Sequence, residues 1–371
     1  MVPAEQPHTI AVLGAGNGGK AVAADVALQG AAARLFEWPE YAANIEALIA
    51  SPVIEAEGVV AGTAELQCAT TDLAEAIEGA DLIIACVQGL AHERLAWELA
   101  SALPAGATVL LNPGSTGGAL EFRRVFAERG GRQPAALAET GTLTHCARAV
   151  GERGVRVTLR VGHVAFAALP ATHTDGLLAR LQRRLPGLRR RADVLEVALC
   201  NGNPAIHPAI MLANLGAIER AAGAHRFYAE GVTPGVGRIV EAVDRERLAI
   251  GVALGYELMT EPEMCVAQGY GTSTDYYECY ARSPVFGDLL SPTSADHRYL
   301  HEDVGLGLVT YVSLGEMLGV ECPRTRGLVE LASAVTGIDY LREGRRSAAR
   351  LGLAGLSTEE RHRFLQGDAA G

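Results

Sequence analysis

A histidine enclosed by two prolines is the first candidate for chemistry in this sequence. The segment Asn203-Pro204-Ala205-Ile206-His207-Pro208 opens a stretch with helical periodicity, at the point where strand patterns end. An imidazole titrates near neutral pH, so it is the usual proton donor or acceptor when hydride reduces a carbonyl or an imine. His207 is therefore a candidate acid/base residue. A buried structural histidine fits the same spacing, and spacing alone leaves both interpretations open.

A second cluster of polar residues begins ninety residues after His207, in His297-Arg298-Tyr299-Leu300-His301-Glu302-Asp303. His297 and His301 are four residues apart and could share a metal on one helical face, but no third ligand is placed, so we expect no metal. On a regular helix Arg298 and Asp303 point about 140° apart. Chemistry shared by these two residues would require the segment to begin as a loop.

Glycines near the N-terminus have the spacing of a dinucleotide-binding loop. Gly14, Gly16 and Gly19 form G-x-G-x-x-G between an apolar strand pattern at Thr9–Leu13 and a helical pattern at 21–29. The glycines permit a tight turn, close approach of the backbone to a pyrophosphate and close helix–strand packing, and the helix N-terminus favours the phosphates.

The residue expected to hold the adenosine ribose is Glu37, at the end of the second predicted strand. A carboxylate there repels a ribose phosphate, so NAD(H) is favoured over NADP(H). The same glycines fit most of a triphosphate-binding P-loop, with Gly14, Gly19 and Lys20 in place. Ala21 stands where that loop needs a hydroxyl for magnesium, which disfavours the triphosphate interpretation.

Three loops should carry ligands, because ligands bind outside the carboxyl ends of the strands of a doubly wound sheet. They are Gly14–Gly19, Gln88-Gly89 and Asn112–Gly118. The third loop offers hydroxyls and free N–H groups, although it could also be only a glycine-rich connection. The predicted cofactor-binding residues are Gly14, Gly16, Asn17, Gly18, Gly19, Lys20, Glu37, Val87, Asn112 and Thr116.

The surrounding patterns predict an α/β fold, with a doubly wound Rossmann-type domain at 1–198 and an all-helical domain at 199–371. Further strands are predicted at 66–70, 81–87, 108–112, 135–139, 155–161 and 193–197, with a hairpin at 57–63. Helices are predicted at 204–222, 236–256, 304–318 and 323–336, and the segment from Ser357 is predicted to be peripheral.

Composition excludes several classes of function. The 371 residues carry a formal charge of −11, which argues against nucleic acid and anionic membranes as partners. No apolar run is long enough to span a bilayer, no signal peptide is recognisable, and seven scattered cysteines suggest a reducing cytoplasm. Lys20 is the only lysine. No lysine outside the nucleotide loop can therefore act as acid, base or Schiff-base amine.

Several blocks of this sequence resemble the octopine/nopaline dehydrogenases, the opine dehydrogenase family, over nearly the whole length. The blocks are Ala11-Val-Leu-Gly-Ala-Gly-Asn-Gly-Gly19, Asn112-Pro-Gly-Ser-Thr-Gly-Gly-Ala-Leu-Glu-Phe122, Glu230-Gly-Val-Thr-Pro234, Arg298-Tyr-Leu-His-Glu-Asp-Val304 and Leu351-Gly-Leu-Ala-Gly-Leu356. The family joins an L-amino acid to a 2-oxo acid and reduces the resulting imine with NADH or NADPH. The resemblance also implies a homodimer.

The resemblance assigns His207, Arg298 and Asp303 to the catalytic positions of the family. It implies that Asp303 orients His207, that His207 moves protons, and that Arg298 binds a substrate carboxylate. The substrate-binding residues predicted with it are Arg298, Gln88 and Asn203. Lys20, His297 and His301 depart from the family pattern.

Two alternatives to an opine dehydrogenase stay open. A ketopantoate-, hydroxyacid- or glycerol-phosphate-type reductase pairs a similar nucleotide domain with helices. By resemblance, such enzymes depend on a lysine near the hydride acceptor. This sequence has no lysine outside the nucleotide loop, which counts against them. A dinucleotide-sensing protein without catalysis would need neither His207 nor Arg298.

Overall fold

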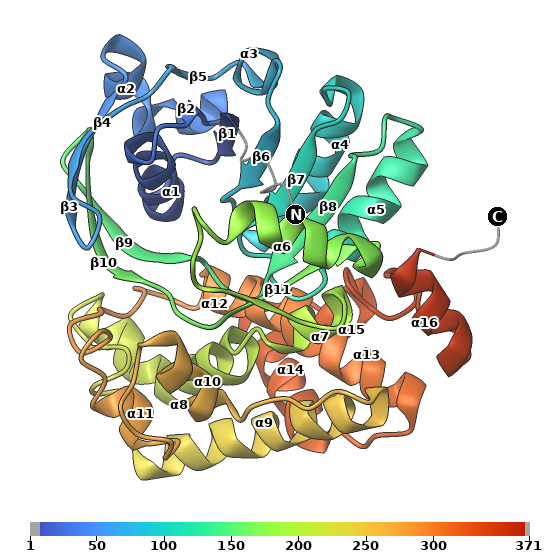
Figure 1. Cartoon of the computed structure of the whole chain (residues 1–371). Helices are drawn as coiled ribbons and strands as arrows, with labels where there is room; N and C mark the ends of the chain where they lie inside the picture. The colour runs from blue at the N-terminus through green and yellow to red at the C-terminus, as the bar shows by residue number, and fades with distance from the viewer. Residues whose placement is uncertain (1–7, 368–371) are drawn as a thin grey trace. The chain divides into compact units, whose positions relative to one another are not determined.

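The computed structural model describes residues 8–367, and these residues fall into two compact units (Figure 1). One unit comprises residues 1–197 together with 357–371, and the other comprises 198–356. The C-terminal segment, expected in the helical domain, therefore groups with the nucleotide-binding unit.

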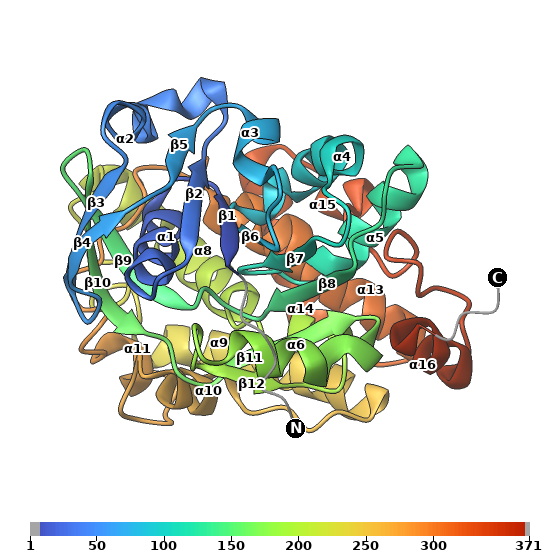
Figure 2. The same cartoon turned by 45° about the horizontal axis from the view of Figure 1, so that its top comes forward.

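The first unit is built on an eight-stranded sheet of order β12-β11-β8-β7-β6-β1-β2-β5 (Figure 2). Its pairs are parallel except that β11 runs antiparallel to β8. The central strands are buried on both faces and read as continuous apolar sequence, as expected for a parallel sheet. The strands are β1 (Thr9–Leu13), β2 (Ala32–Phe36), β5 (Cys68–Thr70), β6 (Leu82–Ala85), β7 (Thr108–Leu111), β8 (Ala136–Thr140), β11 (Val164–Leu169) and β12 (Leu188–Arg190).

Short connections and helices alternate with these strands, as a doubly wound fold requires. The helices are α1 (Asn17–Leu28), α2 (Glu46–Ala50), α3 (Leu73–Ile77), α4 (His92–Ala102), α5 (Gly118–Arg129), α6 (Thr174–Leu181) and α7 (Val194–Leu199), with 3-10 turns at Pro39–Asn44, Gly89–Ala91 and Ala171–His173. The predicted strand at 193–197 is wrong. Asp193 instead accepts hydrogen bonds from the backbone N–H groups of Leu195 and Glu196, which begins α7.

A second, four-stranded sheet of order β4-β3-β10-β9 also belongs to this unit. Its strands are β3 (Val53–Gly58), β4 (Gly62–Glu65), β9 (His145–Val150) and β10 (Gly154–Arg160). The predicted hairpin is present as β3–β4. The predicted strand at 155–161 also forms, but as β10 in this sheet rather than in the main one. Its Val155 and Val157 are buried while the residues between and after them are exposed, so only one face is covered.

The second unit is helical, and among its residues the only strand-type pairing is an isolated bridge between Arg226 and Leu290. The predicted long helices form within two residues of their expected bounds, except that 303–308 is a π-helix. The elements are α8 (Asn203–Ala221), α9 (Pro234–Leu254), α10 (Glu261–Gln268), α11 (Glu278–Ala281), α12 (Arg298–His301), the π-helix Asp303–Leu308, α13 (Val309–Leu318), α14 (Pro323–Thr336) and α15 (Tyr340–Glu343).

The C-terminal helix α16 (Thr358–Gln366) is anchored on the first unit. The guanidinium of Arg123 lies 3.6 Å from the ring centre of Phe364, and it also donates a hydrogen bond to the Phe364 carbonyl. Leu365 is 2% exposed. The segment predicted to be peripheral is therefore a packed helix.

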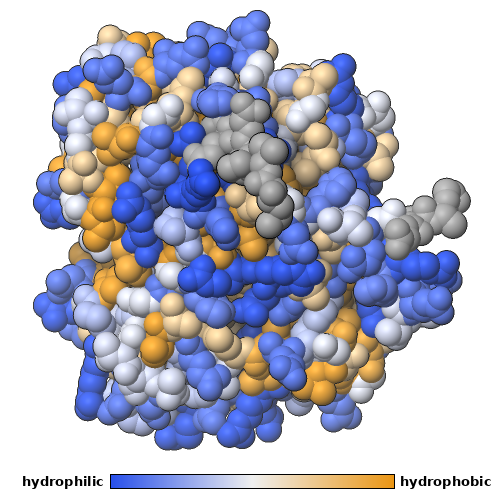
Figure 3. All heavy atoms as spheres, viewed as in Figure 1, coloured by the Kyte–Doolittle hydropathy of each residue, from blue (hydrophilic) through white to orange (hydrophobic). Residues whose placement is uncertain are grey.

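The face of the molecule drawn in Figure 3 mixes hydrophilic and hydrophobic side chains in small groups. Within residues 8–367, no helix combines the length and the apolar character that crossing a bilayer would require.

Candidate active site

The glycine-rich loop between β1 and α1 has the conformation that dinucleotide binding requires. Gly14 has a φ of +100°, which favours glycine, and a side chain at Gly19 would collide with the carbonyl oxygen of Gly14. Gly16 precedes the first turn of α1, where backbone N–H groups point outward. A pyrophosphate fits this cradle, because no side chain blocks the backbone there.

Glu37 ends β2 beside that loop and lines a cavity of about 460 Å³. Its carboxylate accepts hydrogen bonds from the backbone N–H groups of Ala15 and Trp38 and from the Asn44 amide. A carboxylate offers about four acceptor positions, so a ribose hydroxyl can still be bound. The cavity is lined by Gly14, Gly16, Glu37, Trp38, Tyr41, Asn44, Cys86, Val87, Gln88, Leu90 and Ala91. Predicted residues Gly14, Gly16, Glu37, Val87 and Gln88 are thus brought together.

Three other residues of the predicted cofactor loop contact protein. The Lys20 ammonium donates to the carbonyl of Glu152 at 2.9 Å, and its burial lowers its pKa while Glu37 opposes that shift. The Asn17 side chain accepts from the backbone N–H of Ala149. Gly18 lies beside Leu143. Lys20 therefore anchors the β9–β10 turn.

The loop after β7 is fixed by Asn112, which is fully buried. Its amide donates to the Thr144 hydroxyl, and its oxygen accepts from the Thr144 N–H and the Thr140 hydroxyl. This side chain therefore shapes the loop. Ser115 and Thr116 have φ values of 49° and 65°. Such strain in residues other than glycine is concentrated at functional sites.

Glu139 packs against the loop after β7, and the sequence did not predict a role for it. Its carboxylate accepts from the backbone N–H of Ala119 at 2.7 Å, at the start of α5. A side chain at Gly114 would collide with the same carboxylate. The glycine-rich sequence thus reflects close packing over an acid as well as a possible ligand role.

His207 is the centre of a hydrogen-bonded chain inside the second unit. Its Nδ1 lies 2.7 Å from Asp303 Oδ2, and its Nε2 lies 2.9 Å from the Tyr228 hydroxyl. The Tyr299 ring stacks on the imidazole with centroids 3.9 Å apart. His207 and Asp303, predicted from distant parts of the sequence, therefore form a direct pair.

Asp303 is the first residue of a π-helix, Asp303–Leu308, that follows α12 after Glu302. The backbone N–H of Gly307 reaches the carbonyl of Glu302, five residues back, so the helix is wider than an α-helix from this point. Asp303 faces His207 from the start of this wider turn. A π-helical turn of this kind is frequent at functional sites.

Arg298 supplies the positive charge of this cluster. Its guanidinium is 3.5 Å from Glu302 and 5.2 Å from the centre of the Tyr299 ring. Burial opposes its positive charge, but the carboxylates of Glu302 and Asp303 outweigh that effect and raise its pKa. Its side chain is 34% exposed, so the cation is available to an anionic ligand.

Burial governs the protonation of His207. It lowers the pKa of the imidazole, because the desolvation cost of a buried cation exceeds the attraction of Asp303, and Arg298 acts in the same direction as burial. Burial also raises the pKa of Tyr228 well above its ordinary value. The resting arrangement is therefore a neutral imidazole, donating from Nδ1 to Asp303 and accepting at Nε2 from a neutral phenol.

The two additional histidines both contact other groups of the protein. His297 Nδ1 accepts the backbone N–H of Tyr299 and thereby begins α12, while burial and Arg298 lower its pKa to about 4. His301 contacts the Tyr340 hydroxyl and the Asp296 carboxylate. Across residues 8–367, no three His, Cys, Asp or Glu side chains are placed to hold a metal ion.

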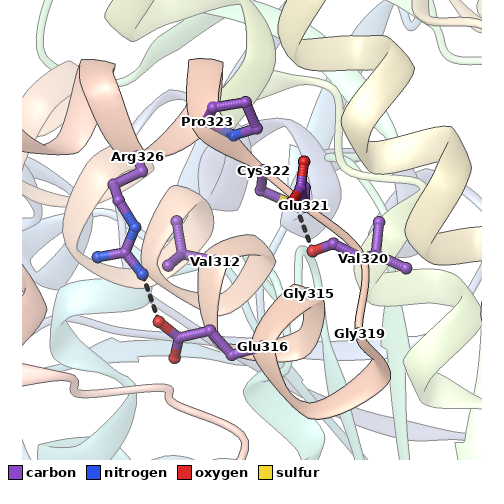
Figure 4. A pocket seen from close by; sticks show the side chains of 9 residues that line it. All are labelled: Val312, Gly315, Glu316, Gly319, Val320, Glu321, Cys322, Pro323 and Arg326. Carbon is purple, nitrogen blue, oxygen red and sulfur yellow. Dashed lines mark hydrogen bonds and ion pairs between the residues drawn. The ribbon is translucent and has the colours of Figure 1, made fainter.

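A further cavity of about 500 Å³ in the helical unit lies between the end of α13 and the start of α14 (Figure 4). Arg326 forms an ion pair with Glu316 on its wall, and the thiol of Cys322 lies 3.6 Å from the Val320 carbonyl. None of His207, Arg298 or Asp303 lines it.

Asn203, which was predicted to bind substrate, is the first residue of α8. Its backbone N–H donates to the Asn201 side chain.

Comparison with known proteins places these two units in one family. Residues 190–336 match the model described as NAD/NADP octopine/nopaline dehydrogenase, alpha-helical domain, and residues 9–110 match NADP oxidoreductase coenzyme F420-dependent. Opine dehydrogenase from Arthrobacter sp. (strain 1C) is 35% identical over 95% of this chain and 97% of its own. The chain belongs to the opine dehydrogenase family. It is thus an NAD(P)-dependent oxidoreductase.

One further relative and two solved structures are also similar to this chain. Vitopine synthase from Allorhizobium ampelinum is 29% identical over 77% of this chain and 78% of its own. Octopine dehydrogenase solved with NADH and L-arginine shares the fold with a TM-score of 0.77, at 19% identity and 98% and 99% coverage. A ketopantoate reductase from Ralstonia eutropha shares it less well, with a TM-score of 0.60 at 19% identity over 88% of this chain and 98% of its own.

Sequence reasoning missed the residues that surround the imidazole. Tyr228 lies in Arg226-Phe-Tyr-Ala-Glu230, directly before a family block, but no spacing distinguishes it from a core aromatic. Tyr299 lies within the family block that runs from Arg298 to Val304, but the sequence did not indicate a role for it. The contacts of both depend on packing between helices distant in sequence.

Proposed function

We propose that this protein is an NADH-dependent opine dehydrogenase, which condenses an L-amino acid with a 2-oxo acid such as pyruvate and reduces the imine between them. The observation that carries the proposal is the buried His207–Asp303 pair, with Nδ1 and Oδ2 2.7 Å apart and the Arg298 cation on the adjoining helix. This is the acid/base and carboxylate-binding equipment that the reaction requires.

NADH would be held by the Gly14–Gly19 loop, with Glu37 on the adenosine ribose. When bound, it supplies the hydride that reduces the imine carbon. The buried Glu37 carboxylate supports NADH over NADPH, because a ribose phosphate would meet a like charge next to the backbone of Ala15.

His207 would move the protons. With Asp303 fixing Nδ1–H, proton exchange is directed to Nε2, as the carboxylate of a hydrolase triad does for its histidine. In the condensation a proton must reach the oxygen of the 2-oxo acid as it leaves as water. In the reverse direction the neutral imidazole would accept the proton of the secondary amine.

Arg298 would bind a substrate carboxylate through its planar guanidinium. Because the protein has a net charge of −11, two anionic substrates need such a local cation. The only lysine is held by the Glu152 carbonyl, so the imine would form between the two substrates and not on the enzyme.

We also propose that the protein is located in the cytoplasm and forms a homodimer. None of the seven cysteines, all of which lie within residues 8–367, is in a disulfide, which supports a reducing compartment. The homodimer is a prediction that light scattering on the purified protein can test.

The direct test of the reaction follows NADH absorbance with pyruvate and each common L-amino acid in turn. We expect NADH consumption only when both substrates are present, with a secondary-amine dicarboxylate as product by mass spectrometry. Consumption with pyruvate alone would indicate a hydroxyacid dehydrogenase, and NADH binding without consumption would indicate a sensing protein.

A further inference from the structure

We propose that the Tyr228 hydroxyl exchanges the catalytic proton with the substrate, so that Asp303, His207 and Tyr228 form a three-membered relay. This inference rests on the proposed function and deepens it by placing a second proton-transfer group between His207 and the substrate.

The first observation is that both nitrogens of the imidazole are occupied. Asp303 Oδ2 lies 2.7 Å from Nδ1, and the Tyr228 hydroxyl lies 2.9 Å from Nε2. A substrate can reach Nε2 directly only if the phenol leaves. The phenol is no more hidden than the imidazole, since Tyr228 is 5% exposed and His207 4%.

The second observation is that the Tyr228 ring is held on several sides. It stacks on Phe286 with centroids 4.6 Å apart and an angle of 20°, and it meets Phe227 edge-on at 5.0 Å. Tyr280 stacks on it at 6.3 Å. Displacing the ring would break these contacts, so passing a proton through its hydroxyl is favoured over moving it aside.

The proton balance of the relay closes with the substrates alone. The ammonium group of the amino acid must lose a proton before its nitrogen attacks, and this proton passes through the relay to the neutral imidazole. In the resulting protonated state, Nε2–H of His207 donates to the phenol oxygen, and the phenol O–H donates to the substrate. The phenol proton moves to the substrate oxygen or nitrogen while the Nε2 proton moves to the phenol oxygen. The imidazolium ends neutral, the phenol is unchanged and the substrate has gained one proton. The reverse sequence removes a proton when the product amine is oxidised.

The test compares wild type with Tyr228→Phe, which keeps the ring and removes only the hydroxyl. We expect kcat to fall about 10²–10⁴-fold, the usual effect of losing a general acid/base, while the NADH dissociation constant stays within about twofold. A proton inventory in H₂O/D₂O mixtures should be curved for wild type, where two protons move together, and linear for the variant.

Tyr311→Phe is the matched control. Tyr311 is also buried in the helical unit, but its hydroxyl donates to the backbone carbonyl of Asn201. Its loss removes one buried hydrogen bond without touching the relay, so kcat and the curved inventory should be retained.

The outcomes separate the relay from the proposed function. Turnover by wild type with an amino acid and pyruvate is measured first, and its absence would overturn the function itself. With turnover present, an unchanged or increased kcat in Tyr228→Phe would overturn the relay alone, because the phenol would then only cover Nε2. If Tyr228→Phe does not fold, a fluorinated tyrosine at position 228 keeps ring and hydroxyl. The relay requires its kcat to shift severalfold, and an unchanged kcat overturns it.

Discussion

At the scale of single residues, the account depends on how Asp303 controls His207. Burial lowers the pKa of the imidazole and Asp303 partly offsets that shift. The carboxylate also selects the tautomer with a proton on Nδ1, which leaves Nε2 to exchange protons. Both effects are lost together when the carboxylate becomes an amide.

Asp303→Asn is therefore expected to lower kcat about 10²–10⁴-fold and to move its pH dependence. In the direction that oxidises the opine, the neutral imidazole is the base, so wild-type kcat should fall as pH drops through a pKa below 6.5. Removing the anion makes the imidazolium less stable, so this acidic limb should move to lower pH. A limb that moves to higher pH would contradict the role given to Asp303.

Glu37 is the second residue whose charge has a direct consequence. Glu37→Ser removes the carboxylate beside the ribose, so we expect weaker NADH binding, by about tenfold, and a relative gain for NADPH. Fluorescence titration with both cofactors measures the ratio. Glu37→Asp retains the charge and serves as the control. A ratio unchanged in Glu37→Ser would show that the carboxylate does not select the cofactor.

At the scale of elements, the π-helix is the feature that sequence patterns did not predict. The run from Val304 to Leu318 has ordinary helical periodicity, and an extra residue in one turn leaves that periodicity nearly intact. Periodicity did predict the long helices α8, α9 and α14, because each buries an apolar face. It could not show that Asp303 pairs with His207.

His297 determines where the helical segment 298–318 begins, because its Nδ1 accepts the N–H of Tyr299. His297→Ala should cost about 0.5–2 kcal/mol of unfolding free energy, as other lost N-caps do. His297→Asn should cost much less, since asparagine also caps helices. Urea denaturation measures both. Equal destabilisation of the two variants would show that His297 does not stabilise the protein by capping α12.

The low pKa of His297, about 4, gives the same cap a pH dependence. The folded state favours the neutral ring, so the contribution of the cap to the free energy of unfolding is fully present above the ordinary histidine pKa near 6.5. It is lost as pH falls from there toward 4. The stability difference between wild type and His297→Ala should therefore shrink over that interval.

At the scale of the whole molecule, the docking of α16 on the nucleotide-binding unit is the main departure from the expected organisation. The charged sequence after Ser357 includes Phe364, which makes two contacts with Arg123, and the buried Leu365. These contacts join residues more than two hundred positions apart. No local sequence pattern predicts a contact over such a distance, and the segment was therefore expected to be peripheral.

Leu365→Ala tests this docking. Leu365 is 2% exposed, so its truncation should cost about 2–3 kcal/mol of unfolding free energy. Leu331→Ala is the matched control, because Leu331 is 49% exposed and its loss should cost little. Equal effects of the two substitutions would mean that α16 contributes no packing.

The nucleotide loop and the His207–Asp303 pair could be predicted because glycine spacing and family blocks carry them in a few adjacent residues. Tyr228, Glu139 and the roles of Lys20 and Asn112 could not, because each depends on a partner that only the folded chain brings near. The fold was thus predictable from periodicity, and the site only in part.

The central claim is that His207 moves the protons of an imine reduction. The most direct measurement is kcat for NADH consumption by His207→Asn, with pyruvate and the best L-amino acid, alongside NADH binding by fluorescence. We predict a fall of about 10²–10⁴-fold in kcat with cofactor binding unchanged. A variant that consumes NADH at the wild-type rate would contradict the account.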